Sequence, residues 1–352
     1  MTKHCSRAPL RFDPAGGGTD APPYRFDYGG DVVNVSINKY AYALFEERPA
    51  REGVTIVSQD FKQSVHVDQV EALLPGGRLG FLKGFLRRFV PSNGGALLVT
   101  RSDVPPGTGL GGSGALGVAI TAVLAKAYGH TLSQTEIVRV ANDIERNDLG
   151  FAGGSQDSYT AVGGIKHIHY PKDGKSSVSR ITLPQDALSR FERDSLLIYT
   201  GTVHLSGRIH ADIKAAYQME DSPVIAAMVN LKDAAQKMVA ALEAGDFETY
   251  AEQLNRSRMN HYRLHESCDN DDLRKYFSIL EPDIMAGKTC GAGGGGYIVV
   301  LCKPGKASVV TRKAEALGAS VSTVTVDQEG VTTWKEPSFT AEELGQMTAV
   351  PR

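Results

Sequence analysis

A glycine-rich segment has the composition of a loop that binds phosphate groups: Pro105-Pro106-Gly107-Thr108-Gly109-Leu110-Gly111-Gly112-Ser113-Gly114-Ala115. Successive backbone N–H groups in such a turn form an anion-binding nest, and small side chains let phosphates approach the backbone. The apolar run that follows predicts a helix whose N-terminus adds its positive dipole end. The expected phosphate contacts are therefore Pro106, Gly107, Gly109, Leu110, Gly111, Gly112, Ser113, Gly114 and Ala115, with the Ser113 hydroxyl reaching a metal that bridges the phosphates.

Two better-known phosphate motifs fit this chain less well. Gly107, Gly109 and Gly112 match the G-x-G-x-x-G pattern of dinucleotide-binding folds, but two prolines separate them from the preceding strand and no acidic residue stands about 20 positions later. The sequence 287–289 (Gly-Lys-Thr) resembles the end of a P-loop, but Pro282 occupies the place of its first glycine. A ligand-free alternative is a tight helix start packed on a sheet, yet five glycines in eleven residues cost too much chain entropy for packing alone.

The elements that must position this loop can be predicted from periodicity. Alternating or apolar runs predict strands at 32–44, 96–100, 195–199 and 297–302. Helices are expected from 113 to 129, after the capping box of Ser133 and Glu136, over 223–244, and from Asp246 to about Ser267. A helix at 306–316 and a strand at 320–326 complete a βαβ-like tail. This mixture predicts an α+β protein.

Glycine is concentrated in four short segments, 16–30, 107–117, 150–164 and 287–296, which hold 22 of the 38 glycines. Such clustering predicts four loops in which the backbone closely approaches a ligand or another segment. At 352 residues two domains are expected. We place them at 1–185, which contains the first three glycine segments, and at 186–340, which contains the fourth. Residues 341–352 are expected to form a tail with at most a short helix.

Composition excludes several classes of protein. The net charge of -2 argues against general binding to nucleic acid or to an anionic membrane. No apolar run reaches 18 residues, and the N-terminal segment lacks the apolar stretch of a signal peptide. Four widely spaced cysteines (Cys5, Cys268, Cys290 and Cys302) are expected to be reduced thiols. We therefore expect a cytoplasmic protein that binds small molecules, with its oligomeric state, a homodimer included, left open.

Three segments, in this order, resemble the motifs of the GHMP kinases, the superfamily of galacto-, homoserine, mevalonate and phosphomevalonate kinases. The first is 8–20, which contains Ala-Pro-Leu-Arg and Gly-Gly-Gly-Thr-Asp; the second is the loop at 105–115; the third is Lys288 with the glycines of 291–296. The resemblance spans residues 8 to about 300. It implies a ribosomal S5 domain 2-like N-terminal domain, a ferredoxin-like two-layer C-terminal domain, ATP and Mg²⁺ as cofactors, and phosphoryl transfer to a hydroxyl group.

The resemblance also implies roles for individual residues. Asp157 corresponds to the catalytic aspartate, which orients the acceptor hydroxyl and takes its proton, and Arg11 to the basic residue beside it. Ser113 and Glu145 correspond to the Mg²⁺ ligands. The family usually has Gly-Ser-Ser-Ser where this chain has Gly112-Ser113-Gly114, so the metal-linked middle serine is kept. Without a ligand, Glu145 would be a solvated acid at a helix end and Arg11 part of an ordinary ion pair.

Within the superfamily, the Gly-Gly-Gly-Thr-Asp form of the first motif, with the later Tyr-Gly-Gly and Gly-Gly-Ser-Gln-Asp, is similar to the D-glycero-D-manno-heptose 7-phosphate 1-kinases. Fucokinase-type domains come next. The resemblance implies phosphorylation of the anomeric hydroxyl to give the 1,7-bisphosphate, in the synthesis of nucleotide-activated heptose for surface polysaccharide. The alternatives are an L-fucokinase-like or other sugar 1-kinase, a catalytically silent sensor of the same fold, and an NAD-dependent oxidoreductase.

Residues for the sugar follow from the same comparison. Gly16, Gly17 and Gly18 would let the sugar ring approach the backbone, and Thr19 and Asp20 would accept its hydroxyl groups. Three further glycines, Gly154, Gly293 and Gly294, are expected in the wall of the sugar site with Asp157. Arg208 is the candidate ligand of a distal substrate phosphate, with Lys288 and Arg25 as weaker candidates.

Two histidine pairs are weighed against metal sites and set aside. His261 and His265 have helical i, i+4 spacing, but no glutamate follows His261 and no third ligand is evident. His167 and His169 alternate on a strand, which favours a solvated strand face over a metal site.

Overall fold

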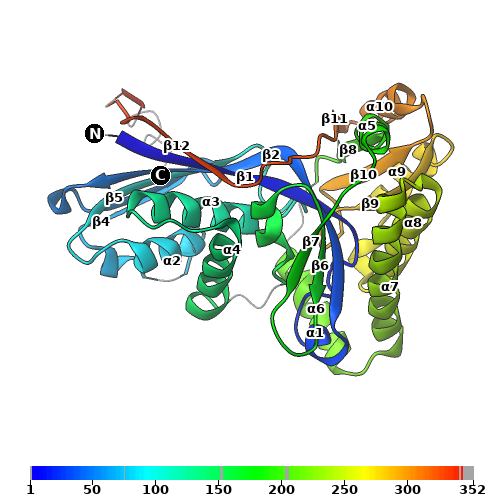
Figure 1. Ribbon diagram of the computed structural model, residues 1–352, viewed down its shortest axis with the longest axis horizontal. Helices are drawn as coiled ribbons and strands as arrows, with labels where there is room; N and C mark the ends of the chain where they lie inside the picture. Colours follow the sequence, from blue (N-terminus) through cyan, green and yellow to red (C-terminus); the bar gives the residue numbers. More distant parts are fainter. Residues whose placement is uncertain (1, 75, 151–153, 203–205, 341, 344–352) are drawn as a thin grey trace.

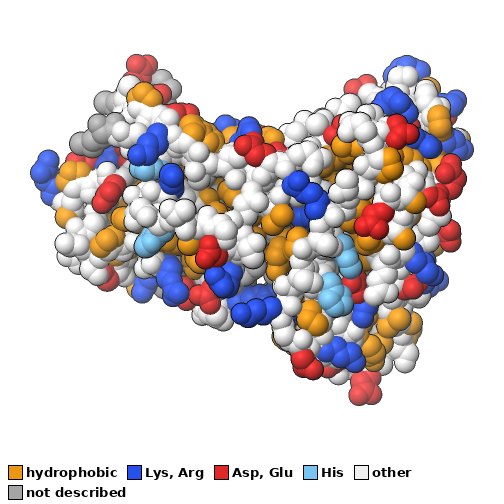
Figure 2. All heavy atoms as spheres, viewed as in Figure 1, with side chains coloured by type: hydrophobic (Ala, Val, Ile, Leu, Met, Phe, Trp, Pro, Cys, Tyr) orange, Lys and Arg blue, Asp and Glu red, His pale blue; other side chains and the backbone are white. Residues whose placement is uncertain are grey.

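The computed structural model describes residues 2–340 and 342–343, except for 75, 151–153 and 203–205; the side chains of 206–208 are also not described. Its described part contains two β-sheets with helices packed against them (Figure 1). The predicted mixture of helices and sheets is confirmed. In Figure 2 the molecule narrows between two ends, with a hollow on the lower edge between α4 and the part that holds α1 and α6.

The first sheet contains eight strands of the described chain: β1 (Thr2–Ala15), β2 (Gly30–Arg48), β3 (Val54–Ser58), β4 (Gln63–Val67), β5 (Gly95–Ser102), β6 (Ile165–Tyr170), β7 (Ser177–Ile181) and β12 (Thr332–Pro337). Their main order is β12-β1-β2-β5-β3-β4. The long strand β2 pairs with β6 over its first part, from Gly30 to Val35, and with β5 from Ala41 onward. Strand β6 in turn pairs with β7.

The second sheet is antiparallel, with the order β11-β8-β10-β9, and contains β8 (Ser195–Tyr199), β9 (Ile284–Thr289), β10 (Tyr297–Cys302) and β11 (Ser320–Thr323). Alternate residues of β10 enter different hydrophobic clusters: Ile298 and Val300 pack with α9 and α10, whereas Val299 and Leu301 join the main core. Both faces are covered, which explains why the sequence of β10 is continuously apolar.

The helices are α1 (Tyr24–Tyr28), α2 (Gly80–Phe89), α3 (Gly112–Ala127), α4 (Gln134–Asp143), α5 (Gln185–Asp194), α6 (Ser206–Gln218), α7 (Ser222–Ala244), α8 (Phe247–Tyr262), α9 (Asp271–Leu280) and α10 (Ala307–Ala316). Short helical turns occur at η1 (Ala50–Glu52), η2 (Val70–Ala72), η3 (Ile144–Asp148), η4 (Gln156–Val162) and η5 (Glu266–Cys268). No helix of the described residues is long and apolar enough to cross a membrane.

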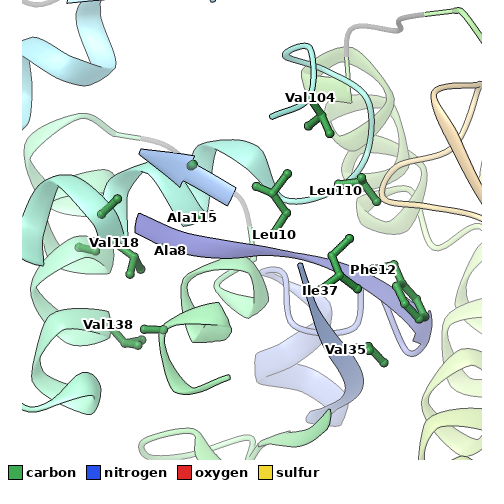
Figure 3. Packing of buried hydrophobic residues seen from close by; sticks show 14 of the residues in the cluster. Ala8, Leu10, Phe12, Val35, Ile37, Val104, Leu110, Ala115, Val118 and Val138 are labelled. Carbon is green, nitrogen blue, oxygen red and sulfur yellow. The ribbon is translucent and has the colours of Figure 1, made fainter. Parts of the chain in front are cut away.

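The apolar helix α3 lies in the main hydrophobic core. Figure 3 shows Ala115 and Val118 of α3 beside the end of β1 that carries Ala8, with Leu110 above the same strand on the side of Leu10. Leu110 is 1% exposed, so burial of its side chain anchors the glycine-rich loop to the core. The start of α3 is therefore held in place by packing on both sides of the loop.

Most predicted boundaries agree with the structure, and the differences have local causes. Ser133 and Glu136 form the predicted capping box, and Gly245 ends α7 in a left-handed conformation. Helix α8 stops at Tyr262 rather than near Ser267, because the side chain of His265 accepts a hydrogen bond from the backbone of Ser267 and begins the turn η5.

The C-terminal βαβ-like tail is split, because β10 and β11 lie on opposite sides of β8. After β11 the chain returns to the first sheet, where β12 pairs antiparallel with β1. One hydrophobic cluster also includes residues of both sheets. The domain boundary near residue 185 stays a prediction, and residues 332–337 add to the sheet of the N-terminal half. The predicted tail at 341–352 lies outside the described residues apart from 342 and 343.

Candidate active site

An arginine–aspartate pair forms the centre of the site. Arg11 comes from β1 and Asp157 from η4, and the guanidinium donates to Oδ1 of Asp157 from Nε at 2.8 Å and from Nη2 at 2.6 Å. Its Nη1 donates to the carbonyl of Gly109 at 2.6 Å. Arg11 therefore fixes the carboxylate relative to the glycine-rich loop. Burial alone would lower the pKa of Arg11, but the carboxylates of Asp157 and Asp13 raise it overall, so the guanidinium stays charged.

A second carboxylate, Asp13, lies beside Arg11. No motif in the sequence singles out this residue. It is fully buried, lies 3.6 Å from Nη1 of Arg11 and 3.3 Å from Nζ of Lys288, and accepts the backbone N–H of Gly291. Burial would raise the pKa of Asp13, but Lys288 and Arg11 lower it overall. The buried carboxylate is thus ionised and compensated by two cations.

The loop at 105–115 enters α3 in the way an anion site requires. Gly107, Gly109 and Gly111 have φ values of +78°, +88° and +70°, which side chains other than glycine rarely adopt. Gly111 is the N-cap of α3, and no side chain caps the helix. Because the first N–H groups of a helix have no partner within it, they are free to bind an anion.

Gly114 explains why this chain departs from the serine-rich form of the motif. A Cβ at Gly114 would collide with the Cβ of Asp157, and would also meet the backbone of Asp157 and Ser158. The first turn of α3 and the turn η4 can approach only because this residue is glycine. The close contact brings the carboxylate of Asp157 beside the start of α3.

Glu145 lies on the π-helical turn η3 and faces α3. Its Oε1 is 3.0 Å from the place where a Cβ on Gly117 would lie, one helical turn after Ser113. This oxygen is buried and has no hydrogen-bond partner among the described residues. Burial first, and then the charge of Asp157, raise the pKa of Glu145 to about 7. Ser113, one turn earlier on α3, is exposed. A carboxylate oxygen without a partner and a serine hydroxyl on this part of α3 fit a Mg²⁺ site, because this cation prefers oxygen ligands.

The fourth glycine segment packs against the second. A Cβ on Gly109 would collide with the carbonyl of Cys290, one on Gly291 with the backbone of Gly109, and one on Gly296 with the carbonyl of Thr108. Tyr297 also donates its backbone N–H to the carbonyl of Thr108. Residues 287–296 therefore buttress the loop at 105–115.

The first glycine segment places Asp20 near Asp157. Asp20 is buried and accepts the backbone N–H of Gln156 at 3.0 Å, and a Cβ on Gly154 would collide with its carboxylate. Burial, with a further contribution from Asp157, raises the pKa of Asp20. Space around Gly18 is open, since a Cβ there would meet no heavy atom within 4 Å.

These groups line one cavity of about 770 Å³, which extends to both sides of the Arg11–Asp157 pair. We call one end the glycine-loop side; it is lined by Arg78, Phe81, residues 105–114, Leu116, Glu145 and Arg146. We call the other the α6 side; it is lined by Gly17, Gly18, Asp20, Tyr24, Gly154, Gln156, His210, Lys214, Tyr217 and His261.

Several predicted site residues do not line this cavity. The hydroxyl of Thr19 donates to the carbonyl of Gly16 at 2.7 Å and accepts the N–H of Asp31, so it holds the loop together. Gly16 itself packs against the carbonyl of Asp31. Gly293 packs against His261 and Cys268, the carbonyl of Gly294 accepts from Asn270, and Ala115 is buried in the core.

Two of the predicted ligands of a distal phosphate, Lys288 and Arg25, do not line this cavity. Lys288 donates to Asp13 and to the carbonyl of Thr289. Arg25 is buried against the ring of Tyr170. The side chain of Arg208 lies outside the described part of the chain.

The histidines behave differently from one another. His261 is buried in the cavity wall, and burial, then Lys288, lower its pKa to about 3, so the imidazole is neutral. His167 and His169 do not form a merely solvated face, because both hydrogen-bond Oδ1 of the buried Asp31 at 2.7 and 2.9 Å.

Among the described residues, no group of three or more His, Cys, Asp and Glu side chains could hold a metal ion. All four cysteines are buried and free.

Arg146 is the main cation on the glycine-loop side that sequence reasoning missed. It follows Glu145 on η3, and its Nη2 is buried without a hydrogen-bond partner in the described chain. A buried N–H donor of a charged group is costly to leave unpaired. The available signal was its position directly after Glu145, but no motif marks it.

Comparison with known proteins agrees with this geometry. Residues 79–164 match the GHMP kinases N-terminal domain. The chain is 30% identical to the D-glycero-alpha-D-manno-heptose 7-phosphate kinase of Campylobacter jejuni, over 94% of this chain and 98% of that protein. At lower identity, 25% over 87% of this chain, it matches the L-fucokinase/L-fucose-1-P guanylyltransferase of Bacteroides fragilis, of which it covers 35%.

Two solved structures are similar over nearly their whole length. One is described as a D-glycero-D-manno-heptose 1-phosphate kinase from Bacteroides thetaiotaomicron, with a TM-score of 0.76, 26% identity, and coverage of 95% of this chain and 100% of that one. The other is a putative sugar kinase from Campylobacter jejuni, with a TM-score of 0.75, 28% identity, and coverage of 96% and 99%.

A glycine loop at a helix start, an adjacent orphaned carboxylate and an arginine-held aspartate define a small-molecule kinase that uses ATP. The chain belongs to the GHMP kinases.

Proposed function

We propose that this protein transfers the γ-phosphoryl group of ATP to the anomeric hydroxyl of D-glycero-D-manno-heptose 7-phosphate and produces the 1,7-bisphosphate. The observation that carries the proposal is the position of Asp157, held by Arg11 between the glycine-loop side and the α6 side of one cavity. The similarity to a heptose 7-phosphate kinase over nearly the whole chain supports the choice of sugar.

The glycine-loop side is suited to the nucleotide. Backbone N–H groups at the start of α3 would bind the β- and γ-phosphates, and Arg146 offers an unpaired guanidinium donor for the same charge. Ser113 and Glu145 would hold Mg²⁺, which when bound neutralises phosphate charge. Phe81 and Leu116 line the same side and offer apolar surface.

Asp157 is suited to handle the proton of the acceptor. The C1 hydroxyl of the sugar would donate to the Asp157 carboxylate, and its oxygen would attack the γ-phosphorus in line with the departing oxygen of ADP. A new C1–O–P linkage forms, the bond between the γ-phosphorus and the β–γ bridging oxygen breaks, and the hydroxyl proton passes to Asp157. Arg11 keeps this carboxylate oriented and offsets the charge that develops.

The α6 side is suited to the sugar ring. Asp20 offers a carboxylate to ring hydroxyls at a position fixed by the backbone of Gln156. The open space at Gly18 would let a ring lie against the backbone. Because a buried carboxylate is costly without partners, hydroxyl donors from a ligand would stabilise the ionised form of Asp20.

The names of the relatives place the substrate phosphate on different carbons, one on C7 and one on C1, so the position must be tested. The purified protein should be incubated with ATP, Mg²⁺ and a panel that contains heptose 7-phosphate, heptose 1-phosphate, unphosphorylated heptose, fucose and galactose. ADP release is expected to be fastest with heptose 7-phosphate. Preferential turnover of fucose would favour the fucokinase-like alternative, and no turnover with ATP bound would favour a silent sensor. A cytoplasmic location and a role in activated-heptose synthesis stay predictions.

A further inference from the structure

The cations around the cavity differ in whether the protein already uses them. Near the centre, Arg11 is bound to Asp157 and Gly109, and Lys288 is bound to Asp13. On the α6 side, Lys214 lines the cavity and is exposed, and no hydrogen bond or ion pair to the described residues occupies its ammonium group. Lys214 is therefore an available positive charge at the end of the cavity away from the glycine loop.

Helix α6 points Lys214 into the cavity because its other residues are anchored. Ile213 packs against the cluster that contains Met228 and Leu231. One turn later, Tyr217 stacks edge-on against Tyr24 and donates to Asp27 at 2.6 Å. These contacts fix the rotation of α6 about its axis. In this rotation Lys214 lines the cavity.

His210 lies one helical turn before Lys214 and also lines the cavity. It shares this side of the cavity with Asp20 and His261. Asp20 in turn is close enough to Asp157 to feel its charge. His210 and Lys214 are thus two basic residues separated by about 6 Å of rise along α6, and both line the side of the cavity that Asp20 lines.

We propose that Lys214, with His210, binds the terminal phosphate of a sugar phosphate and so selects phosphorylated over phosphate-free sugars. The inference rests on the proposed function, because it assumes that the anomeric hydroxyl lies at Asp157 and the ring hydroxyls at Asp20. A phosphate on the carbon farthest from C1 then reaches the α6 end of the cavity, where Lys214 supplies the charge. The sequence alone favours Arg208 for this role, six residues earlier on the same helix.

The test compares Lys214→Gln with the wild type on paired substrates, heptose 7-phosphate and unphosphorylated heptose. Loss of a charged hydrogen bond should raise KM for heptose 7-phosphate roughly ten- to a hundredfold. The KM for unphosphorylated heptose and the KM for ATP should not change. His210→Gln should raise the first KM less. Lys275→Gln, an exposed lysine on α9 outside the cavity, is the matched control and should behave as wild type.

Thermal denaturation provides a readout that needs no turnover, because a ligand of the native state raises the melting temperature. Hexose 6-phosphates and their parent sugars are added to this panel. The proposal predicts that a sugar phosphate stabilises the wild type more than its parent sugar, and that Lys214→Gln removes the difference. The wild type could be stabilised most by a sugar phosphate other than heptose 7-phosphate, with Lys214→Gln abolishing that extra stabilisation. This result would refute heptose 7-phosphate as the substrate but support the role of Lys214. Unchanged phosphate preference in Lys214→Gln, or no preference for any sugar phosphate in the wild type, overturns the inference.

Discussion

The two sides of the cavity present different chemical groups: backbone N–H groups on one side and side chains on the other. The glycine-loop side is mostly backbone: three glycines with positive φ and the uncapped start of α3 present N–H groups, and residues 287–296 support them from behind. The α6 side presents the carboxylate of Asp20 together with side chains from α1, η4, α6 and α8. Backbone N–H groups are the same in every residue type except proline, so they recognise the negative charge of a ligand but not its other features. Side chains differ between residue types, so substitution can change which ligand they recognise. Substrate choice should therefore depend on the α6 side, and the capacity for phosphoryl transfer on the glycine-loop side.

The sharpest way to break this division is at Asp157, where the two sides meet. Asp157→Asn keeps the shape but cannot take a proton, so kcat should fall by about a thousandfold, within the range expected for loss of a general base. The KM values for ATP and sugar should change little. Steady-state ADP release measures both. Asp173→Asn, an exposed aspartate outside the cavity, is the control, and a near-wild-type kcat in Asp157→Asn would refute the catalytic assignment.

A second test concerns the pH dependence of the glycine-loop side. The pKa of Glu145 is raised to about 7, above its ordinary value of 4.5, so the cation-free protein holds a proton there that Mg²⁺ must displace. The concentration of free Mg²⁺ needed for half-maximal rate should therefore rise by up to about tenfold per pH unit below pH 7, and level off above it.

The same shift has a consequence for stability without Mg²⁺. Because the folded state holds this proton more tightly than the unfolded state, stability should decrease as the pH rises from about 4.5 to 7. Denaturation at several pH values measures the slope, and Glu145→Gln should reduce it while weakening Mg²⁺ activation. Equal slopes in the two proteins would show that Glu145 is not the buried titrating group.

The smallest expected effect separates two glycines of the same loop. Gly109 has φ +88° and its Cβ would collide with Cys290, so Gly109→Ala should destabilise the fold by about 1–3 kcal/mol. Gly112 has open space around it, so Gly112→Ala should leave stability almost unchanged and raise KM for ATP by crowding the phosphates. Thermal denaturation and ATP titration of the two variants give the comparison. Equal stability losses would contradict the close packing of 287–296 on this loop.

The features that could be predicted from the sequence are those that depend on neighbouring residues, whereas contacts between distant residues could not be predicted. The helix capping box at Ser133, strands β8 and β10 and the glycine loop are local patterns, and each was recognised from neighbouring residues. The pairing of Asp13 with Lys288 joins residues 275 positions apart, so no local pattern reveals it. Lys214 carries no motif, and its place in the cavity wall follows from the packing of α6 against α1.

Two other differences have the same origin. The sequence predicts that the Thr19 hydroxyl binds the sugar. In the structure this hydroxyl is hydrogen-bonded to the backbone of Gly16 and Asp31 instead. His167 and His169 alternate as expected on β6, yet the buried partner Asp31 lies on the neighbouring strand β2. Local sequence predicts which residues are polar, and tertiary contacts decide which of them are free to meet a ligand.

The most direct test of the central claim is the position of the transferred phosphate. The protein should be incubated with ATP, Mg²⁺ and heptose 7-phosphate, and the product examined by phosphorus NMR with detection of coupling to sugar protons. Our account predicts one new phosphate ester coupled to the anomeric proton, formed in equal amount to ADP, and formed about a thousandfold more slowly by Asp157→Asn. A new ester on any other carbon, or ADP formed without a sugar product, would contradict it.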